Sequence, residues 1–444
     1  PHSVYISEEQ FKAFSKSYEG YFGVGLKYSI ISGQYVVTSV IESGPAAISG
    51  VRVGDRIVQI GGMPIQEMDA AAIELHLSGN DDKYVSLEIA RPNEEEMLTF
   101  ELPKRQIDHE SVPVAFMVDD QTGYIKILNF TDTTPTEIDI AFAQLRQEGM
   151  SQLILDLRNN SGGAFEAGAA VADRFLSGGK MIVFTKGRAL RSSQQYIATA
   201  SKTFPRTPLI VLVNEATASD AEIVAGAIQD WDRGLIVGRR TFGKALVQTE
   251  FPFQDGSILL LTTARYYTPL GRLIQSDYYA NPSLSLKDEE FRFKKYKTPQ
   301  GRLVFGGGGI RPDIKLDKVS KEIPSAIKKL YLSREDVFFK FADAYAAELS
   351  QEQQVRDLGD FLKDFQVSSA MLEDFYELVK AANVPVQQSE LRSHHNEIKN
   401  SIKIEIAWRL WGEKGRYAAA ALTDAEIKKS LSYFGQASGL IAKH

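Results

Sequence analysis

The chain has 444 residues, 43% of them hydrophobic and 24% charged, a composition typical of a soluble globular protein with two or three domains. Its formal net charge of -6 and the absence of dense lysine and arginine runs argue against nucleic acid as a partner. No run approaches the roughly 20 apolar residues that would span a bilayer. The lack of cysteine excludes disulfides, thiol catalysis and cysteine-rich metal sites.

The amino-terminal part of the chain is predicted to consist of a short helical segment and a strand-rich domain. Aromatic residues at helical spacing between Ser7 and Tyr18 favour a helical stub over residues 1–20. Residues 21–105 instead alternate apolar and polar positions, as in QYVVTSVI at 34–41, which is typical of half-buried strands.

A glycine-containing loop lies at the start of the strand-rich domain. Its residues are Phe22, Gly23, Val24, Gly25 and Leu26. Consecutive N–H groups in such a loop can bind a terminal carboxylate while the peptide adds as a strand to an open sheet edge. Isolated glycines more often mark ordinary turns. Together with the turns SGPAA at 43–47 and VGDRI at 53–57, however, the loop makes this domain resemble a PDZ domain.

Residues 106–318 are predicted to form an α/β core, because short buried strands alternate with helical patterns. In this region LILDL at 153–157 indicates a buried strand, followed by the tight turn NNSGG at 159–163. Such glycines often only relieve backbone strain. Without Cβ atoms, however, Gly162 and Gly163 would also let a substrate carbonyl approach backbone N–H donors.

Ser219 and Lys244 carry the chemistry that the core predicts. A buried strand at 208–213 runs through Ser219 into a helical pattern, and a hydroxyl at such a turn lies where outward N–H groups and the helix dipole favour negative charge. A tetrahedral acyl-transfer intermediate needs that environment. All six histidines lie outside residues 110–383, so a Ser-His-Asp triad would need a distant base. A lysine among apolar residues can replace histidine, which predicts a Ser-Lys hydrolase.

Residues 319–444 are predicted to form a helical domain. Apolar residues recur every three or four positions at 372–379 and 398–411, and TDAE at 423–426 resembles a capping box. Residues 278–305 are polar and aromatic with several lysines. They are expected to form an insertion, for which the sequence indicates no role.

Four motifs, taken in order, resemble the carboxyl-terminal processing proteases, which are PDZ-containing serine peptidases of the tail-specific type. The motifs are LDLRNNSGG at 155–163, TASDAEI at 217–223 followed by TFGK at 241–244, ARYYTP at 264–269, and GGIRPD at 308–313. The resemblance implies a multidomain α/β (α+β) fold. A crotonase/ClpP-like protease core would carry an inserted β-rich PDZ domain and a C-terminal helical domain.

The resemblance also implies roles for single residues. Ser219 is expected to be the nucleophile, Lys244 the general base, and Gln248 the residue that orients the lysine amine. Asp230 matches an acidic position that is sometimes assigned to the family's active site. A structural brace to Arg233 or to a helix end is the competing interpretation of Asp230.

The oxyanion hole implied by the resemblance consists of the backbone N–H groups of Gly162, Gly163 and Asp220. Loss of one such donor typically lowers the rate on the order of 10²–10³-fold. Asp220 is also a departure from the family, which usually has alanine there, and it puts a carboxylate beside the nucleophile. Asp156 and Arg158 are expected to form a structural ion pair.

We therefore predict a serine endopeptidase that cleaves protein or peptide substrates near accessible C-termini, with PDZ-mediated recognition or gating. Two alternatives stay open: a catalytically retired PDZ scaffold, and a crotonase-type acyl-CoA enzyme. No cofactor and no metal are implied, and the terminal helical regions are candidates for a homo-oligomer interface. The sequence shows no export signal, so an extracytoplasmic, periplasmic location is inferred from the family alone.

Overall fold

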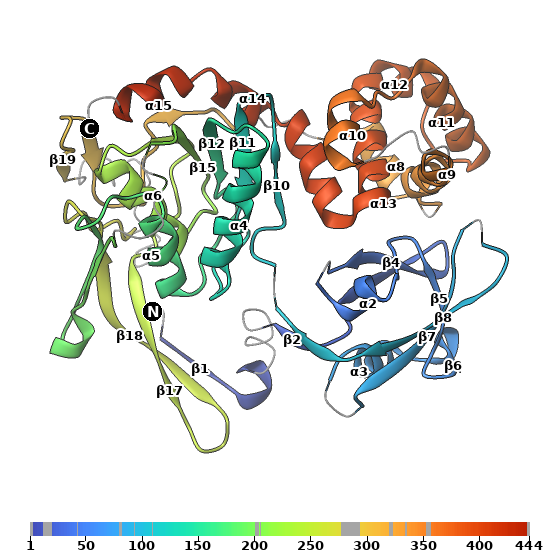
Figure 1. The fold of residues 1–444 in the computed structure, drawn as a ribbon, viewed down its shortest axis with the longest axis horizontal. Coiled ribbons are helices and arrows are strands. Elements are labelled where there is room, and N and C mark those ends of the chain that lie inside the picture. The colour runs from blue at the N-terminus through green and yellow to red at the C-terminus, as the bar shows by residue number, and fades with distance from the viewer. Residues whose placement is uncertain are drawn as a thin grey trace. The chain divides into compact units, whose positions relative to one another are not determined.

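The structure is a computed structural model with two compact units. It describes residues 3–11, 20–41, 43–79, 82–92, 94–108, 110–199, 204, 206–276, 294–318, 323–333, 335–351 and 357–441. The first unit combines residues 1–19, 109–319 and 425–444, and the second combines residues 20–108 and 320–424. Figure 1 labels their helices and strands.

The first unit is built around a six-stranded sheet in the order β10-β11-β12-β15-β16-β21. The strands are β10 (Val114–Met117), β11 (Thr122–Lys126), β12 (Gln152–Asp156), β15 (Leu209–Val213), β16 (Leu235–Gly238) and β21 (Ile314–Lys315). All neighbours are parallel except β10 and β11. Every residue of β15 is buried, so both faces of the sheet are covered there, as is usual in parallel sheets.

Helices complete the core of the first unit. They are α4 (Thr134–Gln147), α5 (Phe165–Asp173), α6 (Asp220–Asp230), α14 (Ala425–Leu431) and α15 (Phe434–Ile441). Helix α6 is buried along its whole length, and α15 packs against β15. The tail predicted as one helical domain over 319–444 is therefore divided between the units, because its last helices bury their apolar residues, such as Ala437, against the core.

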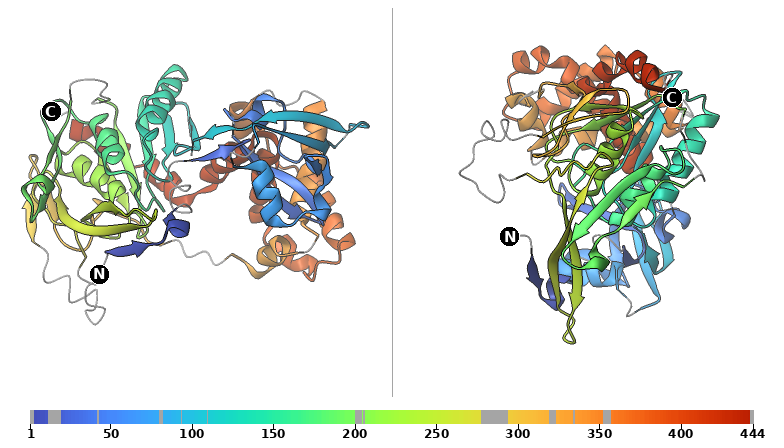
Figure 2. Two further views of the ribbon diagram at one scale, coloured as in Figure 1. Left: turned by 90° about the horizontal axis from the view of Figure 1, so that it is seen from below. Right: turned by 90° about the vertical axis from the view of Figure 1, so that its left-hand side faces the viewer.

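A second sheet in the first unit contains β1 (Val4–Ile6), β13 (Met181–Gly187), β14 (Gln195–Ile197), β17 (Leu246–Pro252) and β18 (Ile258–Tyr267). Figure 2 shows β17 and β18 as a long projecting hairpin. The helical stub expected over residues 1–20 contains a strand instead, since β1 pairs antiparallel with β18. Residues 8–11 are helical, and 12–19 lie outside the described residues.

Part of the predicted insertion at 278–305 can be described. Residues 277–293 lie outside the described residues. The remainder includes the two-stranded hairpin of β19 (Lys295–Lys297) and β20 (Leu303–Phe305), which leads to the glycine turn at 306–309. Arg272 Nη1 donates to Phe305 O at 2.9 Å, so this hairpin is connected to the turn that follows β18.

The second unit contains the strand-rich domain. Its main sheet has the order β3-β4-β5-β7-β8, with β6 on β5, and a separate pair joins β2 to β9. The elements are β2 (Tyr21–Gly23), β3 (Leu26–Ile31), β4 (Gln34–Val40), α2 (Pro45–Ile48), β5 (Arg56–Ile60), β6 (Met63–Pro64), α3 (Ala70–Leu77), β7 (Tyr84–Ala90), β8 (Leu98–Pro103) and β9 (Arg105–Ile107). Alternate residues of β7 are buried, as the alternating sequence predicts.

Helices make up the rest of the second unit. They are α8 (Ser325–Tyr331), α9 (Val337–Gln351), α10 (Leu358–Asp364), α11 (Ser369–Ala381), α12 (Gln388–Ser393) and α13 (His395–Thr423). Helix α13 packs on the strand-rich domain, since Trp408 Nε1 donates to Thr38 O at 2.9 Å and Arg409 donates to Val53 O. Among the described residues, no helix is long and apolar enough to cross a membrane.

Candidate active site

Ser219 lies at the sharp connection between β15 and α6. It is the N-cap residue of α6, has φ 56° and ψ -117°, and is partly exposed. A positive φ is unusual for a residue with a side chain and costs free energy, and such strain occurs often at functional sites. The predicted strand-turn-helix arrangement around this serine is therefore present, with the serine in a strained backbone conformation.

Glu222, in the first turn of α6, connects Ser219 to Lys244 through backbone hydrogen bonds. Its Oε2 atom accepts the N–H of Ser219 at 3.0 Å and the N–H of Lys244 at 2.9 Å. Its Oε1 atom accepts the Gly243 N–H at 2.8 Å and the Thr241 hydroxyl. Burial raises the pKa of Glu222 to about 7, although these four hydrogen bonds oppose the shift. One carboxylate thus fixes both candidate catalytic segments.

Sequence reasoning missed Glu222. The spacing of Ser219 and Glu222 matches a capping box, in which the acidic side chain accepts the N–H of the cap residue. That signal was available, but only the fold shows that the same oxygen also reaches Lys244, 22 residues away from Glu222.

Replacement of Glu222 by glutamine should lower both activity and stability. Glutamine puts an amide NH₂ group where an oxygen now accepts two N–H groups, leaving buried donors unpaired. We expect the free energy of unfolding, measured by thermal unfolding, to fall by about 2 kcal/mol, and the activity to fall at least tenfold. Glu250→Gln on exposed β17 is the matched control and should change neither quantity. Wild-type activity in Glu222→Gln would contradict this role.

Tyr266 on β18 gives a second connection between the same two segments. Its hydroxyl oxygen lies 3.0 Å from Ser219 O and 2.8 Å from Lys244 O. Burial, together with the negative charges of Glu222 and Asp220, raises the pKa of Tyr266 well above its ordinary value. The phenol therefore keeps its proton and remains a donor to these carbonyls.

Lys244 itself lies in the loop between β16 and β17 and is partly buried. Among the described residues, no hydrogen bond joins Ser219 Oγ to Lys244 Nζ. Gln248 lies four residues farther along, in β17, opposite Thr262 of β18 and next to an irregularity in the strand register. Glu222 therefore holds the backbones of the predicted pair together, while the structure describes no hydrogen bond between their side chains.

The glycine turn lies next to Ser219. Gly162 has φ 102°, and a Cβ atom there would lie 2.7 Å from Ser219 Cβ. Gly163 has φ 156°, and its Cβ would lie 2.0 Å from Phe130 O, so neither position accommodates a side chain. Neither N–H is open, however. Gly162 N–H donates to Asn160 Oδ1 at 2.8 Å, and Gly163 N–H donates to Asp220 Oδ2 at 2.7 Å.

Asp230 occupies a structural position at the far end of α6. It follows Ser219 by 11 residues, which is about 16 Å along a helix. Its Oδ1 atom pairs with Arg272 Nη2 at 2.6 Å, both side chains being fully buried, and its Oδ2 atom accepts the Leu270 N–H at 2.9 Å. Of the two predicted braces, the one to a helix end is closer to the structure, since Asp230 is the last residue of α6, whereas Arg233 donates to backbone carbonyl groups. Asp230 instead fixes the turn after β18.

Comparison with known protein families identifies the family to which this arrangement of residues belongs. Residues 121–286 match the model of peptidase family S41, residues 36–91 match a PDZ domain, and residues 330–412 match a family of unknown function. The chain belongs to peptidase family S41. The S41 match contains Ser219, Lys244, Glu222 and the glycine turn, so these residues lie in the peptidase domain.

Relatives of this S41 chain include carboxyl-terminal processing proteases. A chloroplastic C-terminal processing peptidase of Tetradesmus obliquus is 34% identical over 267 residues, 56% of this chain and 57% of the relative. A carboxy-terminal-processing protease of Bartonella bacilliformis is 34% identical over 280 residues, 62% and 64% of the two chains. A solved photosystem II D1 C-terminal processing protease is 30% identical, covering 71% and 78%, with a TM-score of 0.39. The S41 chain spans 57% and 64% of the two curated relatives' lengths.

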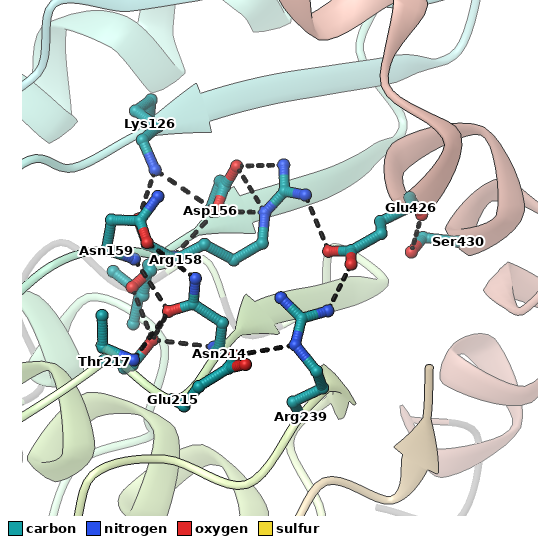
Figure 3. Close-up of polar contacts among 12 residues, drawn as sticks. Lys126, Asp156, Arg158, Asn159, Asn214, Glu215, Thr217, Arg239, Glu426 and Ser430 are labelled. Atoms are coloured by element: carbon teal, nitrogen blue, oxygen red, sulfur yellow. Dashed lines mark hydrogen bonds and ion pairs between the residues drawn. The ribbon is translucent and has the colours of Figure 1, made fainter. Parts of the chain in front are cut away.

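Figure 3 shows an ion-pair network at the carboxyl ends of the S41 core strands. The predicted pair of Asp156 and Arg158 is confirmed, at 2.7 Å. Burial would raise the pKa of Asp156, but Lys126 and Arg158 outweigh it and lower the pKa to about 2. Glu426 of α14 accepts from Arg158 Nη1 at 2.9 Å and also pairs with Arg239. The carboxyl-terminal helices are thus connected to the segments that lead into the glycine turn and the lysine loop.

The loop predicted over residues 22–26 of the PDZ domain is shorter in the structure, because Phe22 and Gly23 lie in β2 and Leu26 begins β3. Val24 N–H donates to Leu77 O at 3.1 Å, and Gly25 has φ 76°. In the described part of this sheet, β3 is an end strand whose only neighbour is β4. Among all the residues that the structure describes, no group of three or more acidic or histidine side chains could hold a metal ion.

Proposed function

We propose that this S41 chain is a serine endopeptidase in which Ser219 is the nucleophile and Lys244 the general base. The observation that carries the proposal is that Glu222 Oε2 accepts hydrogen bonds from both residues' backbone N–H groups. A nucleophile and its base must share one small region of the protein, and this carboxylate joins their backbones. Gln248 is proposed to orient the lysine amine.

In the proposed reaction, Ser219 Oγ attacks the substrate carbonyl as its proton passes to the Lys244 amine. The carbonyl oxygen becomes an oxyanion, for which the N–H groups of Gly163 and Asp220 are the proposed donors. Gly162 is less suited, because its N–H closes a local turn with Asn160. The leaving amine takes the proton from the lysine, and water then hydrolyses the acyl-enzyme.

A serine-reactive fluorophosphonate and an unfolded protein substrate together test this proposal. We expect covalent labelling at Ser219 and cleavage of the substrate. A retired scaffold would show neither reaction. A crotonase-type enzyme would turn over acyl-CoA thioesters without labelling. The crotonase-type alternative has less support, because the family model that matches residues 121–286 is that of a peptidase family.

Substrate recognition is proposed to depend on the free C-terminus of the substrate. A terminal carboxylate would bind the loop formed by residues 22–26 while the peptide pairs with the open edge of β3. Amidation of that terminus should lower kcat/KM about tenfold or more, because one charge-assisted contact is worth roughly 1.5–3 kcal/mol.

The matched control is a change of the residue on the far side of the scissile bond, which should have a smaller effect than amidation. Equal cleavage of free-acid and amidated peptides would remove tail recognition from the proposal and leave the serine chemistry untouched.

Two further parts of the proposal rest on the family resemblance. We propose an extracytoplasmic location, which fractionation of producing cells would check. We also propose that the terminal helical regions support a homo-oligomer, which sedimentation velocity of the full chain would detect.

A further inference from the structure

The side chain of Asp220, directly after the candidate nucleophile, binds one of the N–H groups proposed above for the oxyanion hole. The residue is 2% exposed, and its Oδ2 atom accepts the Gly163 N–H at 2.7 Å. This is one of the two N–H groups that the proposed reaction needs. In this structure, it is directed at a carboxylate of the chain itself.

The neighbouring glycines accommodate this side chain. A Cβ atom at Gly162 would lie 3.1 Å from Asp220 Oδ2, and one at Gly168 of α5 would lie 2.7 Å from Asp220 Cβ. Two Cβ atoms do not come that close in real proteins. Helix α5 can therefore pack against Asp220 only because residue 168 is glycine. The Cβ atom of Asp220 therefore packs closely against α5, and its carboxylate lies beside Gly162.

A carboxylate oxygen resembles an oxyanion in charge and in its need for N–H donors. The Gly163 N–H cannot serve the side chain and a tetrahedral intermediate at the same time, so the two compete for it. We propose that the Asp220 carboxylate is an internal ligand of the oxyanion hole that keeps the S41 site closed until it is displaced or protonated. This inference rests on the function proposed above.

The charged and titratable groups around Asp220 give the closure a pH dependence. They are Lys244 before β17, Glu166 on α5, Tyr266 on β18 and Glu222 on α6. Burial raises the pKa of Asp220 to about 6, against the opposing effects of the Gly163 hydrogen bond and the Lys244 charge. Above that pH the carboxylate binds the Gly163 N–H. Below it the neutral acid is a weaker acceptor, and the hole is easier to open.

The test compares the parent with Asp220→Ala, measuring the rate of fluorophosphonate labelling of Ser219 and kcat/KM on a peptide at pH 7.5. Alanine keeps the backbone donor and the Cβ atom but removes the competing carboxylate. We expect both rates to rise about tenfold or more. The ratio of variant to parent should fall towards one as the pH is lowered through about 6. Asp220→Asn, which keeps the shape and removes the charge, should give a smaller rise.

The matched control is Glu166→Gln, which removes a nearby negative charge that does not bind the Gly163 N–H. It should leave both rates within about twofold of the parent, since Glu166 is exposed. A parent that is labelled as fast as Asp220→Ala, or faster, overturns the closure while the Ser219 assignment stands. Absence of labelling and of cleavage in every variant overturns the proposed function and the closure together. If the alanine variant does not fold, the asparagine variant decides by the same comparison.

Discussion

Ser219→Ala should abolish peptide-bond hydrolysis, with kcat/KM reduced on the order of 10⁴-fold or more. The substitution removes one partly exposed oxygen and leaves the Ser219 N–H bond to Glu222 intact. The fold, followed by circular dichroism, and the binding of C-terminal peptides should therefore be unchanged. Fluorophosphonate labelling should disappear in parallel with cleavage.

Ser161→Ala is the matched control for this prediction. Ser161 is exposed and lies in the glycine turn next to the same site, so it is the obvious rival hydroxyl. Its removal should leave most of the activity. Residual turnover above about a few per cent in Ser219→Ala, or loss of labelling in Ser161→Ala, would show that Ser219 is not the nucleophile.

Lys244→Arg should be as inactive as Lys244→Ala, although arginine preserves the positive charge. A guanidinium group does not lose a proton near neutral pH, so it cannot accept the proton of the serine hydroxyl. The Lys244 N–H bond to Glu222 is a backbone contact and survives both substitutions. The activity of the two variants should differ from each other far less than either differs from the parent.

Lys186→Arg, at an exposed position of β13, is the control for a lysine-to-arginine exchange and should remain active. An arginine variant at position 244 that retains substantial activity would show that the side chain acts by its charge alone. In that case another group would have to be the base.

The sequence predicted the local features of the site better than its long-range contacts. The buried strand, the turn at Ser219 and the glycine turn all have patterns within a few adjacent residues. The roles of Glu222 and Tyr266 depend on partners in other elements, so no local pattern carries them. The contact of Glu426 with Arg158 joins positions 268 residues apart in the chain.

Two other differences have the same physical origin. Strand β1 forms because an edge of β18 is available to it, which the composition of residues 1–20 does not reveal. The carboxylate of Asp220 was visible in the sequence as a departure beside the nucleophile. Its hydrogen bond to Gly163 could not be predicted, because that contact requires two loops to meet.

The second unit is built from two separate segments of the chain, which limits how this peptidase can be divided into parts. Its PDZ domain, within residues 20–108, and its helices, within residues 320–424, are two separate insertions into one peptidase chain, and the backbone crosses between the units four times. Trp408 and Arg409 of α13 need Thr38 and Val53 as acceptors. Deleting the PDZ domain alone would remove these two hydrogen-bond acceptors of α13 and expose the helices of the second unit. Chimaeras with related peptidases should therefore exchange both insertions together, as a single transferable unit encoded in two pieces.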